Sequence, residues 1–312
     1  MRKVKFLGTT DPLAQLAFLV LCIVWGSTYL VIKVGVNELP PALFAGVRFT
    51  AVGIILLVYA RLKGIKMPDS WEDIKVSAIV GLFLLAGGAG LVVWSEQHIT
   101  SGLAALLIAT EPIFIALLER FLPGGKSISK LGWTGLILGF LGVGLLVAPD
   151  LGLGRTYVLG LLGVLAASFS WSLGSVYSVR RPVASPTVIN IAIQSLAGGS
   201  VLVLIGLLAG EAARFHLTPT GIWALIYLTG AGSLLAYSAY IYLIKVIPPY
   251  KAATYSYVNP VVAVLLGFLI LDEPITKATI IGATIILSGI VLVQSSKIRD
   301  LPQGDLKESQ SI

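Results

Sequence analysis

Long apolar stretches recur at short intervals over nearly the whole chain, and they limit the fold more than any other feature. A helix needs about 20 mostly apolar residues to cross a bilayer core of roughly 30 Å. Ten stretches reach or approach this length, and only short polar or Pro/Gly-containing connections separate them. The predicted spans are Leu13–Ile32, Ala42–Ala60, Val76–Trp94, Gly102–Leu118, Leu131–Ala148, Tyr157–Val179, Pro186–Gly210, Gly221–Ile244, Ala252–Leu271 and Ala278–Val293.

Composition agrees with a membrane protein. Only 12% of the 312 residues are charged, whereas a soluble domain carries about a quarter. A net charge of +7 would suggest a nucleic-acid partner in a soluble protein. Here the basic residues sit in short clusters between apolar stretches, so we expect a lipid bilayer and no nucleic acid. The first stretch exceeds a signal-peptide core, and no Ala-x-Ala site follows it.

The distribution of Lys and Arg predicts the orientation, because cytoplasmic loops of membrane proteins are enriched in these residues. With ten spans, 17 of the 22 basic residues fall on the side of the two termini and 4 on the other side. We therefore predict a multi-pass protein of the cell inner membrane with both termini in the cytoplasm. Residues 1–12 form a cytoplasmic segment in this scheme, and residues 297–312 form a polar, disordered cytoplasmic tail.

The chain also repeats itself weakly at an offset of about 148 residues. Glu111-Pro112 in the first half matches Asn259-Pro260 in the second. The predicted repeats, 13–148 and 157–294, hold five helices each, so the two copies must insert with opposite topology. Inverted repeats are typical of secondary transporters, which bind their substrate near the midplane. The predicted fold class is thus an all-α membrane protein with ten transmembrane helices in two inverted repeats.

Several motifs together resemble one known family. They are Trp25-Gly26-Ser27-Thr28-Tyr29, Pro40-Pro41 with Arg48-Phe49, Glu111-Pro112, and Tyr255-Ser256-Tyr257-Val258-Asn259-Pro260-Val261 followed by Glu273. Over residues 12–296 the chain resembles the EamA-type branch of the drug/metabolite transporter superfamily. The resemblance implies a 5+5 basket of helices, a central cavity between the halves, and efflux of metabolites or amino acids.

Two charged residues fall inside predicted spans. A charge at the centre of a spanning helix costs about 2.5–3.5 kcal/mol on insertion scales, so Arg48 and Glu111 each need a reason. Their predicted depths allow them either to pair or to face one water-filled cavity. A substrate or proton site and an ion pair that locks two helices are both open at this point.

Two prolines fall at matching places in the halves. Pro112 frees the carbonyl of Ile108, and Pro260 frees that of Ser256, because proline has no N–H. Glu111 and Asn259 stand beside these breaks, so acceptors from both halves are predicted near one depth. Packing kinks are the alternative interpretation.

Aromatic residues deep in the predicted spans suggest a cavity lining for an apolar or aromatic solute, although Trp and Tyr often belong to the interfacial belts. Combined with the polar positions, the predicted substrate-binding set is Trp25, Tyr29, Arg48, Glu111, Trp171, Tyr237, Tyr257 and Asn259.

The fifth and tenth predicted helices carry glycines at regular spacing. Gly135, Gly139 and Gly142 lie on the fifth, and Gly282 and Gly289 on the tenth. Small residues at such spacing allow helices to approach closely. These faces are predicted to be either scaffold within the chain or the contact of a homodimer.

No cofactor, metal or catalytic residue is predicted. Gly124-Gly125-Lys126-Ser127 lacks the opening glycine of a phosphate-binding loop, so ATP is not expected. His98, His216 and Cys22 are far apart in sequence and do not suggest a metal site.

The leading prediction is a secondary transporter, which exports small metabolites such as amino acids by alternating access. Proton coupling is left open. The alternative is an intramembrane enzyme acting on a lipid-linked substrate, with Glu111 and Arg48 catalytic.

Overall fold

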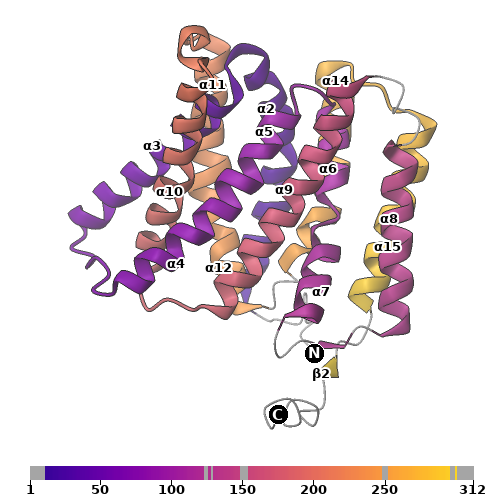
Figure 1. Ribbon diagram of the computed structural model, residues 1–312, viewed down its shortest axis with the longest axis horizontal. Coiled ribbons are helices and arrows are strands. Elements are labelled where there is room, and N and C mark those ends of the chain that lie inside the picture. Colours follow the sequence, from indigo (N-terminus) through magenta and orange to yellow (C-terminus); the bar gives the residue numbers. More distant parts are fainter. Residues whose placement is uncertain are drawn as a thin grey trace, which may run out of the picture.

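The computed structural model of the protein describes residues 11–122, 126–127, 129–147, 154–247, 252–295 and 299–300. These residues are almost entirely helical, and the long helices lie side by side (Figure 1). In chain order the elements are α1 (Pro12–Val20), η1 (Leu21–Trp25), α2 (Gly26–Glu38), α3 (Pro41–Leu62), α4 (Trp71–Gly81), η2 (Leu82–Gly90), α5 (Leu91–Ser95), α6 (Ser101–Ile108), α7 (Glu111–Phe121), β1 (Lys126–Ser127), α8 (Lys130–Val147), α9 (Arg155–Arg180), α10 (Thr187–Leu208), η4 (Glu211–Arg214), α11 (Pro219–Tyr227), η5 (Leu228–Tyr237), α12 (Ser238–Val246), η6 (Ala253–Tyr257), α14 (Asn259–Leu271), α15 (Lys277–Ser295) and β2 (Arg299–Asp300).

Eight helical segments of the described chain are long and apolar enough to cross a membrane. They are Pro12–Glu38, Pro41–Leu62, Trp71–Ser95, Ser101–Phe121, Arg155–Arg180, Thr187–Leu208, Pro219–Val246 and Ala253–Leu271. A shorter apolar stretch, Lys277–Gly289, lies in α15, which packs against α8. The prediction of an all-α membrane protein is confirmed at this level. The two remaining predicted spans correspond to α8 and α15.

The first helical segment extends beyond its predicted end at Ile32 and continues to Glu38. Lys33 therefore lies within a helix, although the sequence places it in a loop. Its ammonium group donates to the backbone carbonyls of Glu96 and Ile99, at 2.5 and 2.9 Å. These internal acceptors allow the helix to carry a charged residue near the end of the membrane span.

Helix starts follow ordinary capping chemistry. Pro41 occupies the first turn of α3, where the missing N–H of proline costs nothing. The Thr100 side chain accepts from the N–H of Leu103 at the start of α6, and the Thr218 side chain accepts from that of Gly221 at the start of α11. Such caps satisfy backbone donors that a helix leaves unpaired.

Glycines bring helices of the two sequence halves into backbone contact. A Cβ atom at Gly289 of α15 would lie 2.6 Å from the carbonyl oxygen of Gly135 and from the N of Gly139, both on α8. Likewise a Cβ at Gly142 would lie 2.8 Å from the N of Ile286. The scaffold interpretation of these glycines is the one that the structure supports. Within the chain, a Cβ atom at Gly139, Gly142 or Gly289 would meet atoms of a neighbouring helix.

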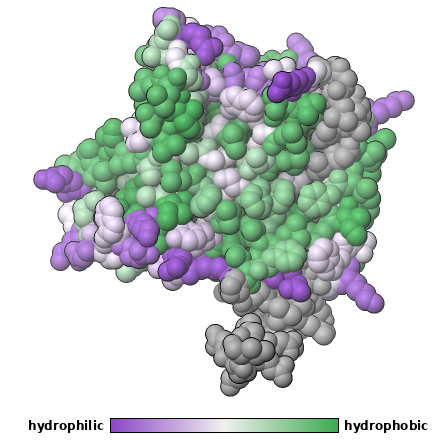
Figure 2. Space-filling view, in the orientation of Figure 1, coloured by the Kyte–Doolittle hydropathy of each residue, from purple (hydrophilic) through white to green (hydrophobic). Residues whose placement is uncertain are grey.

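Large apolar side chains cover the outside of the bundle. Figure 2 shows a broad hydrophobic band, with hydrophilic residues gathered toward opposite ends of the molecule. Exposed members of the band include Leu16, Ile54, Phe268 and Leu269. A surface of this kind suits contact with lipid tails, because it would be unfavourable in water.

Most of the two predicted terminal segments, 1–12 and 297–312, lies outside the described residues. Arg299 and Asp300 are an exception, because they form β2 and pair in antiparallel fashion with Ser127 and Lys126 of β1. This short pairing brings the segment after α15 next to the segment after α7, and the rest of the predicted tail lies outside the described residues.

Candidate functional site

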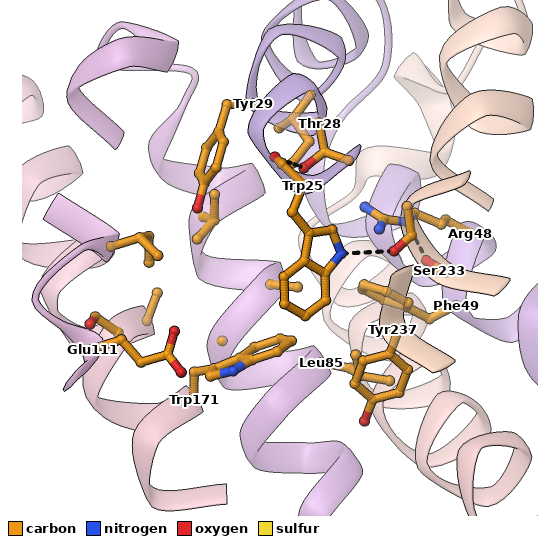
Figure 3. Close-up of a pocket in the computed structure, with 18 of the residues that line it drawn as sticks. Trp25, Thr28, Tyr29, Arg48, Phe49, Leu85, Glu111, Trp171, Ser233 and Tyr237 are labelled. Atoms are coloured by element: carbon orange, nitrogen blue, oxygen red, sulfur yellow. Dashed lines mark hydrogen bonds between the residues drawn. The ribbon is translucent and has the colours of Figure 1, made fainter. Parts of the chain in front are cut away.

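A cavity of about 80 Å³ lies between helices of both sequence halves (Figure 3). Its lining contains six of the eight residues that the sequence predicted to bind substrate: Trp25, Tyr29, Arg48, Glu111, Trp171 and Tyr237. Sequence reasoning did not select several other lining residues, which include Thr28, Phe49, Ser168, Ser233 and Tyr255.

Segments of π-helix form parts of the cavity wall. η2 contributes Leu85 and Gly88, and η5 contributes Gly232 and Ser233. η2 and η5 occupy the third helix of each predicted repeat, so this irregularity recurs at matching places. Wide π-turns are rare in α-helices as a whole, but those that occur are often found at functional sites. The glycine clusters at 87–90 and 230–232 are the signal that could have indicated them from the sequence.

A cluster of aromatic rings fills the centre of the site. Trp25 meets Trp171 edge to face, with ring centroids 5.3 Å apart and planes at 86°. The Trp25 ring also contacts Tyr240 and Tyr255, at 5.3 and 5.0 Å. Its indole N–H donates to the carbonyl oxygen of Gly232 at 3.0 Å. Trp25 is therefore held by contacts from four elements of the second half: α9, η5, α12 and η6.

Arg48 supplies a buried positive charge on one wall. It lies on α3 with only 6% of its surface exposed. Its Nε donates to Ser233 Oγ at 2.9 Å, and its guanidinium group lies 4.7 Å from the centre of the Phe49 ring. Among the described residues Arg48 has no carboxylate partner. Since a buried charge is costly unless it is paired, this cation is suited to binding an anionic group.

Glu111 supplies a carboxyl group on another wall. It is the first residue of α7 and is 1% exposed. Tyr255 donates its hydroxyl to Glu111 Oε2 at 2.8 Å. The other carboxyl oxygen, Oε1, is buried and has no hydrogen-bond partner among the described residues. Buried polar atoms of proteins are almost always paired, so an unpaired one facing a cavity indicates a place for a ligand or water.

Hydroxyl groups on α9 support the break beside Glu111. Ser172 Oγ donates to the backbone carbonyl of Glu111 at 3.1 Å, and the hydroxyls of Ser168 and Thr110 lie 3.1 Å apart. A third serine, Ser175, lies 2.6 Å from the Tyr240 hydroxyl. The contacts to Glu111 and Thr110 satisfy polar groups at an interrupted helix, which hydrocarbon cannot do.

The prolines interrupt their helices as the sequence predicted. α6 ends at Ile108 and α7 begins at Glu111, with Pro112 in its first turn. In the second half η6 ends at Tyr257 and α14 begins at Asn259, with Pro260 in its first turn.

Arg48 and Glu111 both line the cavity but do not form an ion pair. Figure 3 shows them on opposite sides of the site, with Trp25 between them. Of the two interpretations that the sequence left open, the shared cavity agrees with the structure. The ion pair that locks two helices is wrong, because each side chain finds a neutral hydroxyl partner from the second half.

Two predicted site residues, Tyr257 and Asn259, lie outside the cavity lining. Asn259 is 1% exposed, and its amide nitrogen is placed to donate to the backbone carbonyls of Cys22 and Leu21 at 3.0 and 3.2 Å. These carbonyls belong to the π-turn of η1. Asn259 therefore braces the helix that presents Trp25. Tyr257 packs half-buried beside the hydrophobic core, and Tyr255, two residues earlier, enters the site instead.

No group of three or more His, Cys, Asp or Glu side chains in the described part of the chain is arranged to hold a metal ion. The functional groups that line the cavity include one guanidinium group, one carboxyl group, hydroxyls and aromatic rings.

Comparison with known proteins agrees with this architecture. The model of the EamA-like transporter family matches the chain twice, over residues 12–148 and 158–295. The two matches suggest duplicated halves. A solved crystal structure shares the fold, with a TM-score of 0.67, 22% identity and coverage of 90% of this chain and 96% of the other.

Curated relatives extend over nearly the whole chain. The inner membrane transporter YedA of Escherichia coli (strain K12) is 39% identical over 282 residues, which are 90% of each chain. The transporter YvbV of Bacillus subtilis (strain 168) is 27% identical and covers 93% of this chain, and 94% of YvbV is covered. A protein of Escherichia coli (strain K12) named "Probable amino-acid metabolite efflux pump" is 29% identical, with 88% of this chain and 92% of that protein covered.

These matches set aside the alternative of an intramembrane enzyme. This chain belongs to the EamA-like transporter family of the drug/metabolite transporter superfamily, and it is a multi-pass inner-membrane transporter of small molecules.

Proposed function

We propose that this protein is a secondary transporter that exports zwitterionic metabolites, with amino acids as the main class. The observation that carries the proposal is the charge arrangement of the cavity. Within the part of the chain that the structure describes, a buried guanidinium group without a carboxylate partner lies on one side, and a buried carboxyl group with one unpaired oxygen lies on the other. Aromatic rings lie between them (Figure 3).

Each end of an amino acid finds a complementary group in this arrangement. The solute carboxylate binds Arg48, whose planar guanidinium suits two-point contact with carboxylates. The solute ammonium group binds Glu111 Oε1. An apolar or aromatic side chain packs against Trp25, Trp171 and Tyr237. A molecule that lacks one of the two charges would leave a buried polar group of the site unpaired, and this raises the free energy of binding.

The cavity must widen for such a solute to enter. Its volume of about 80 Å³ is far below the roughly 300 Å³ at which ligand pockets usually begin. Widening alternately toward the two sides of the membrane is the motion of alternating access, and we propose it here without ATP. The name of the amino-acid efflux relative supports export as the direction.

The proposed architecture is ten spans in two inverted repeats, 13–148 and 157–294, with both termini in the cytoplasm. Matching proline breaks before α7 and α14 support the repeat. Matching π-helical segments η2 and η5 support it as well. In a transporter of this type the site lies where the two repeats meet.

Glu111 is also our candidate for proton coupling. A carboxyl group that binds either a proton or the solute ammonium group exchanges one for the other during a cycle. That competition would allow an inward proton gradient to drive export.

Counterflow in proteoliposomes tests the proposal. Vesicles loaded with an unlabelled aromatic amino acid should accumulate the same labelled amino acid without ATP. Matched analogues that lack the carboxylate or the ammonium group should exchange at least tenfold more slowly. Equal exchange of all three compounds would contradict the two-charge site, and no exchange of any amino acid would contradict the substrate class.

A further inference from the structure

A second polar cluster lies apart from the cavity, at the turn that joins α5 to α6. It consists of Lys33 from α2, Glu96 in the turn, and Glu273 from the connection after α14. α5 and α6 also carry Val92 and Ile108, which line the cavity. Movement of this turn would therefore be transmitted to the wall of the site.

One cation and one anion hold the turn. Lys33 Nζ donates to the backbone carbonyls of Glu96 and Ile99, at 2.5 and 2.9 Å. The Glu273 carboxylate accepts from the backbone N–H and hydroxyl of Ser101, both at 2.8 Å, and from the N–H of Gly102 at 3.2 Å. Hydrogen bonds thus hold the turn to α2 on one side and to the segment after α14 on the other.

The Glu96 carboxyl group takes no part in these contacts. Glu96 is 0% exposed, and both of its carboxyl oxygens are buried without a hydrogen-bond partner among the described residues. Lys33 bonds to the backbone of Glu96 and not to its side chain. With Lys33 positive and Glu273 negative, an ionised Glu96 would leave a net buried negative charge, which is very unfavourable.

Burial raises the pKa of the Glu96 carboxyl well above its usual range. Lys33 opposes this rise in pKa, and the negative charge of Glu273 adds to it. The neutral form of Glu96 is therefore the form that fits the clasped turn.

Other titratable groups lie on the elements around Glu96. On α2 they are Tyr29 and Glu38, and Glu38 accepts from Thr218. In the turn itself His98 packs its ring against Trp94. Arg48 lies on α3, and Arg155 and Tyr157 lie at the start of α9. Arg48 is bonded to Ser233, and Arg155 is exposed.

Tyr29 connects this cluster with the cavity. It lines the cavity. Tyr29 and Lys33 are four residues apart on α2, so they share one face of the helix. Lys33, which donates to the Glu96 carbonyl, therefore lies on the same helix face as a residue that lines the cavity.

We propose that Glu96 is a proton-binding site that controls the α5–α6 turn. This inference rests on the proposed alternating-access function, because the turn would act as a gate at its end of the cavity. When Glu96 is protonated, Lys33 stays on the two carbonyls and the turn is closed. When Glu96 loses its proton to water, its carboxylate competes for the Lys33 ammonium group, and the turn is released.

The direction of the pH effect follows from this scheme. A carboxyl group that is neutral in the closed form binds its proton more tightly there than in the open form. The closed form is therefore fully favoured at low pH, and it loses this advantage as the pH rises above the ordinary range of a glutamate.

Labelling of a thiol in the turn tests the inference without any substrate. In a Cys22→Ala background of the full chain, Ile99→Cys places a reporter at a position that is 2% exposed. Gln97→Cys provides an exposed control for the intrinsic effect of pH on thiol reactivity. The ratio of maleimide labelling at position 99 to that at position 97 should rise at least threefold between pH 5 and pH 9. Adding Glu96→Gln should remove the rise.

If Ile99→Cys prevents folding, a second reporter is Leu103→Cys on α6, at a position that is 8% exposed and follows the same turn.

Two carboxylates provide a matched pair of further variants. Glu273→Gln removes a negative charge beside Glu96, so the midpoint of the rise should move to lower pH. Glu211→Gln removes a similar cap, from the N–H groups of Ala42 and Leu43 at the start of α3, and should leave the midpoint unchanged. The inference would be overturned if the labelling ratio did not change with pH while Glu96 is present. It would also be overturned if the rise in this ratio persisted in Glu96→Gln. Failure of counterflow with a normal labelling response would instead contradict the proposed substrate class.

Discussion

Tyr255 donates its hydroxyl to the Glu111 carboxylate at 2.8 Å, although the two residues are 144 positions apart. Glu111 begins α7 in the first half, and Tyr255 lies in η6, just before α14 of the second half. The two residues belong to the two proline-interrupted helices, so this bond joins the predicted repeats directly at the cavity.

Glu111→Gln should abolish pH-gradient-driven accumulation while counterflow persists at saturating solute. Glutamine keeps the shape and can still accept from Tyr255, but it carries neither a titratable proton nor a charge for the solute ammonium group. The solute concentration for half-maximal counterflow should rise about tenfold, which corresponds to roughly 1.4 kcal/mol. Glu119→Gln, on the same helix but outside the cavity lining, is the control. Unchanged pH dependence and affinity in Glu111→Gln would contradict both roles.

Arg48→Met should weaken exchange of solutes that carry a carboxylate by about 10- to 100-fold, because a hydrogen bond to a charged group contributes roughly 1.5–3 kcal/mol. Arg48→Lys should recover only part of this loss, since lysine keeps the charge but not the planar fork. Half-saturation in counterflow measures both effects. Arg61→Met, at an exposed position of the same helix, should have little effect. Equal losses at positions 48 and 61 would argue against an anion site.

Gly289→Ala should lower stability by about 1–3 kcal/mol, the usual range for overpacking. The added Cβ would lie 2.6 Å from backbone atoms of α8, which cannot move aside easily. Gly230→Ala is the matched control, because no heavy atom lies within 4 Å of the Cβ it would add. Thermal unfolding in detergent compares the two. Equal melting temperatures would show that the α8–α15 contact is looser than the structure indicates.

Reporter fusions test the proposed topology. A fusion after Arg155 should report the periplasmic side, and one after Lys297 the cytoplasmic side, because five spans separate these points in the ten-span scheme. Alkaline phosphatase and a cytoplasmic fluorescent reporter, each placed at both sites, give opposite readings for each site. The same side at both positions would mean an even number of spans between them and would rule out the 5+5 arrangement.

The sequence by itself determined the helical membrane fold and the positions of the helix breaks. Bilayer thickness sets the length of an apolar span, so each predicted span could be located from composition alone. Pro112 and Pro260 interrupt their helices because proline lacks the N–H that the preceding turn needs. Burial of charge in a span also identified Arg48 and Glu111 as residues with a special environment.

Only the tertiary structure decided which side chains meet. Ser233 is 185 positions from Arg48 in the sequence. The sequence of each helix does not indicate how that helix is rotated about its own axis, so it does not predict that the two side chains meet. The rotation of their helices also gives Asn259 and its repeat counterpart Glu111 different surroundings. Asn259 faces the carbonyls of η1, whereas Glu111 faces the cavity. Period and composition specify that a residue lies in a span, but the packing of neighbouring helices specifies its direction. For that reason the charge arrangement of the site, and the Glu96 carboxyl group that finds no hydrogen-bond partner among the described residues, became visible only in three dimensions.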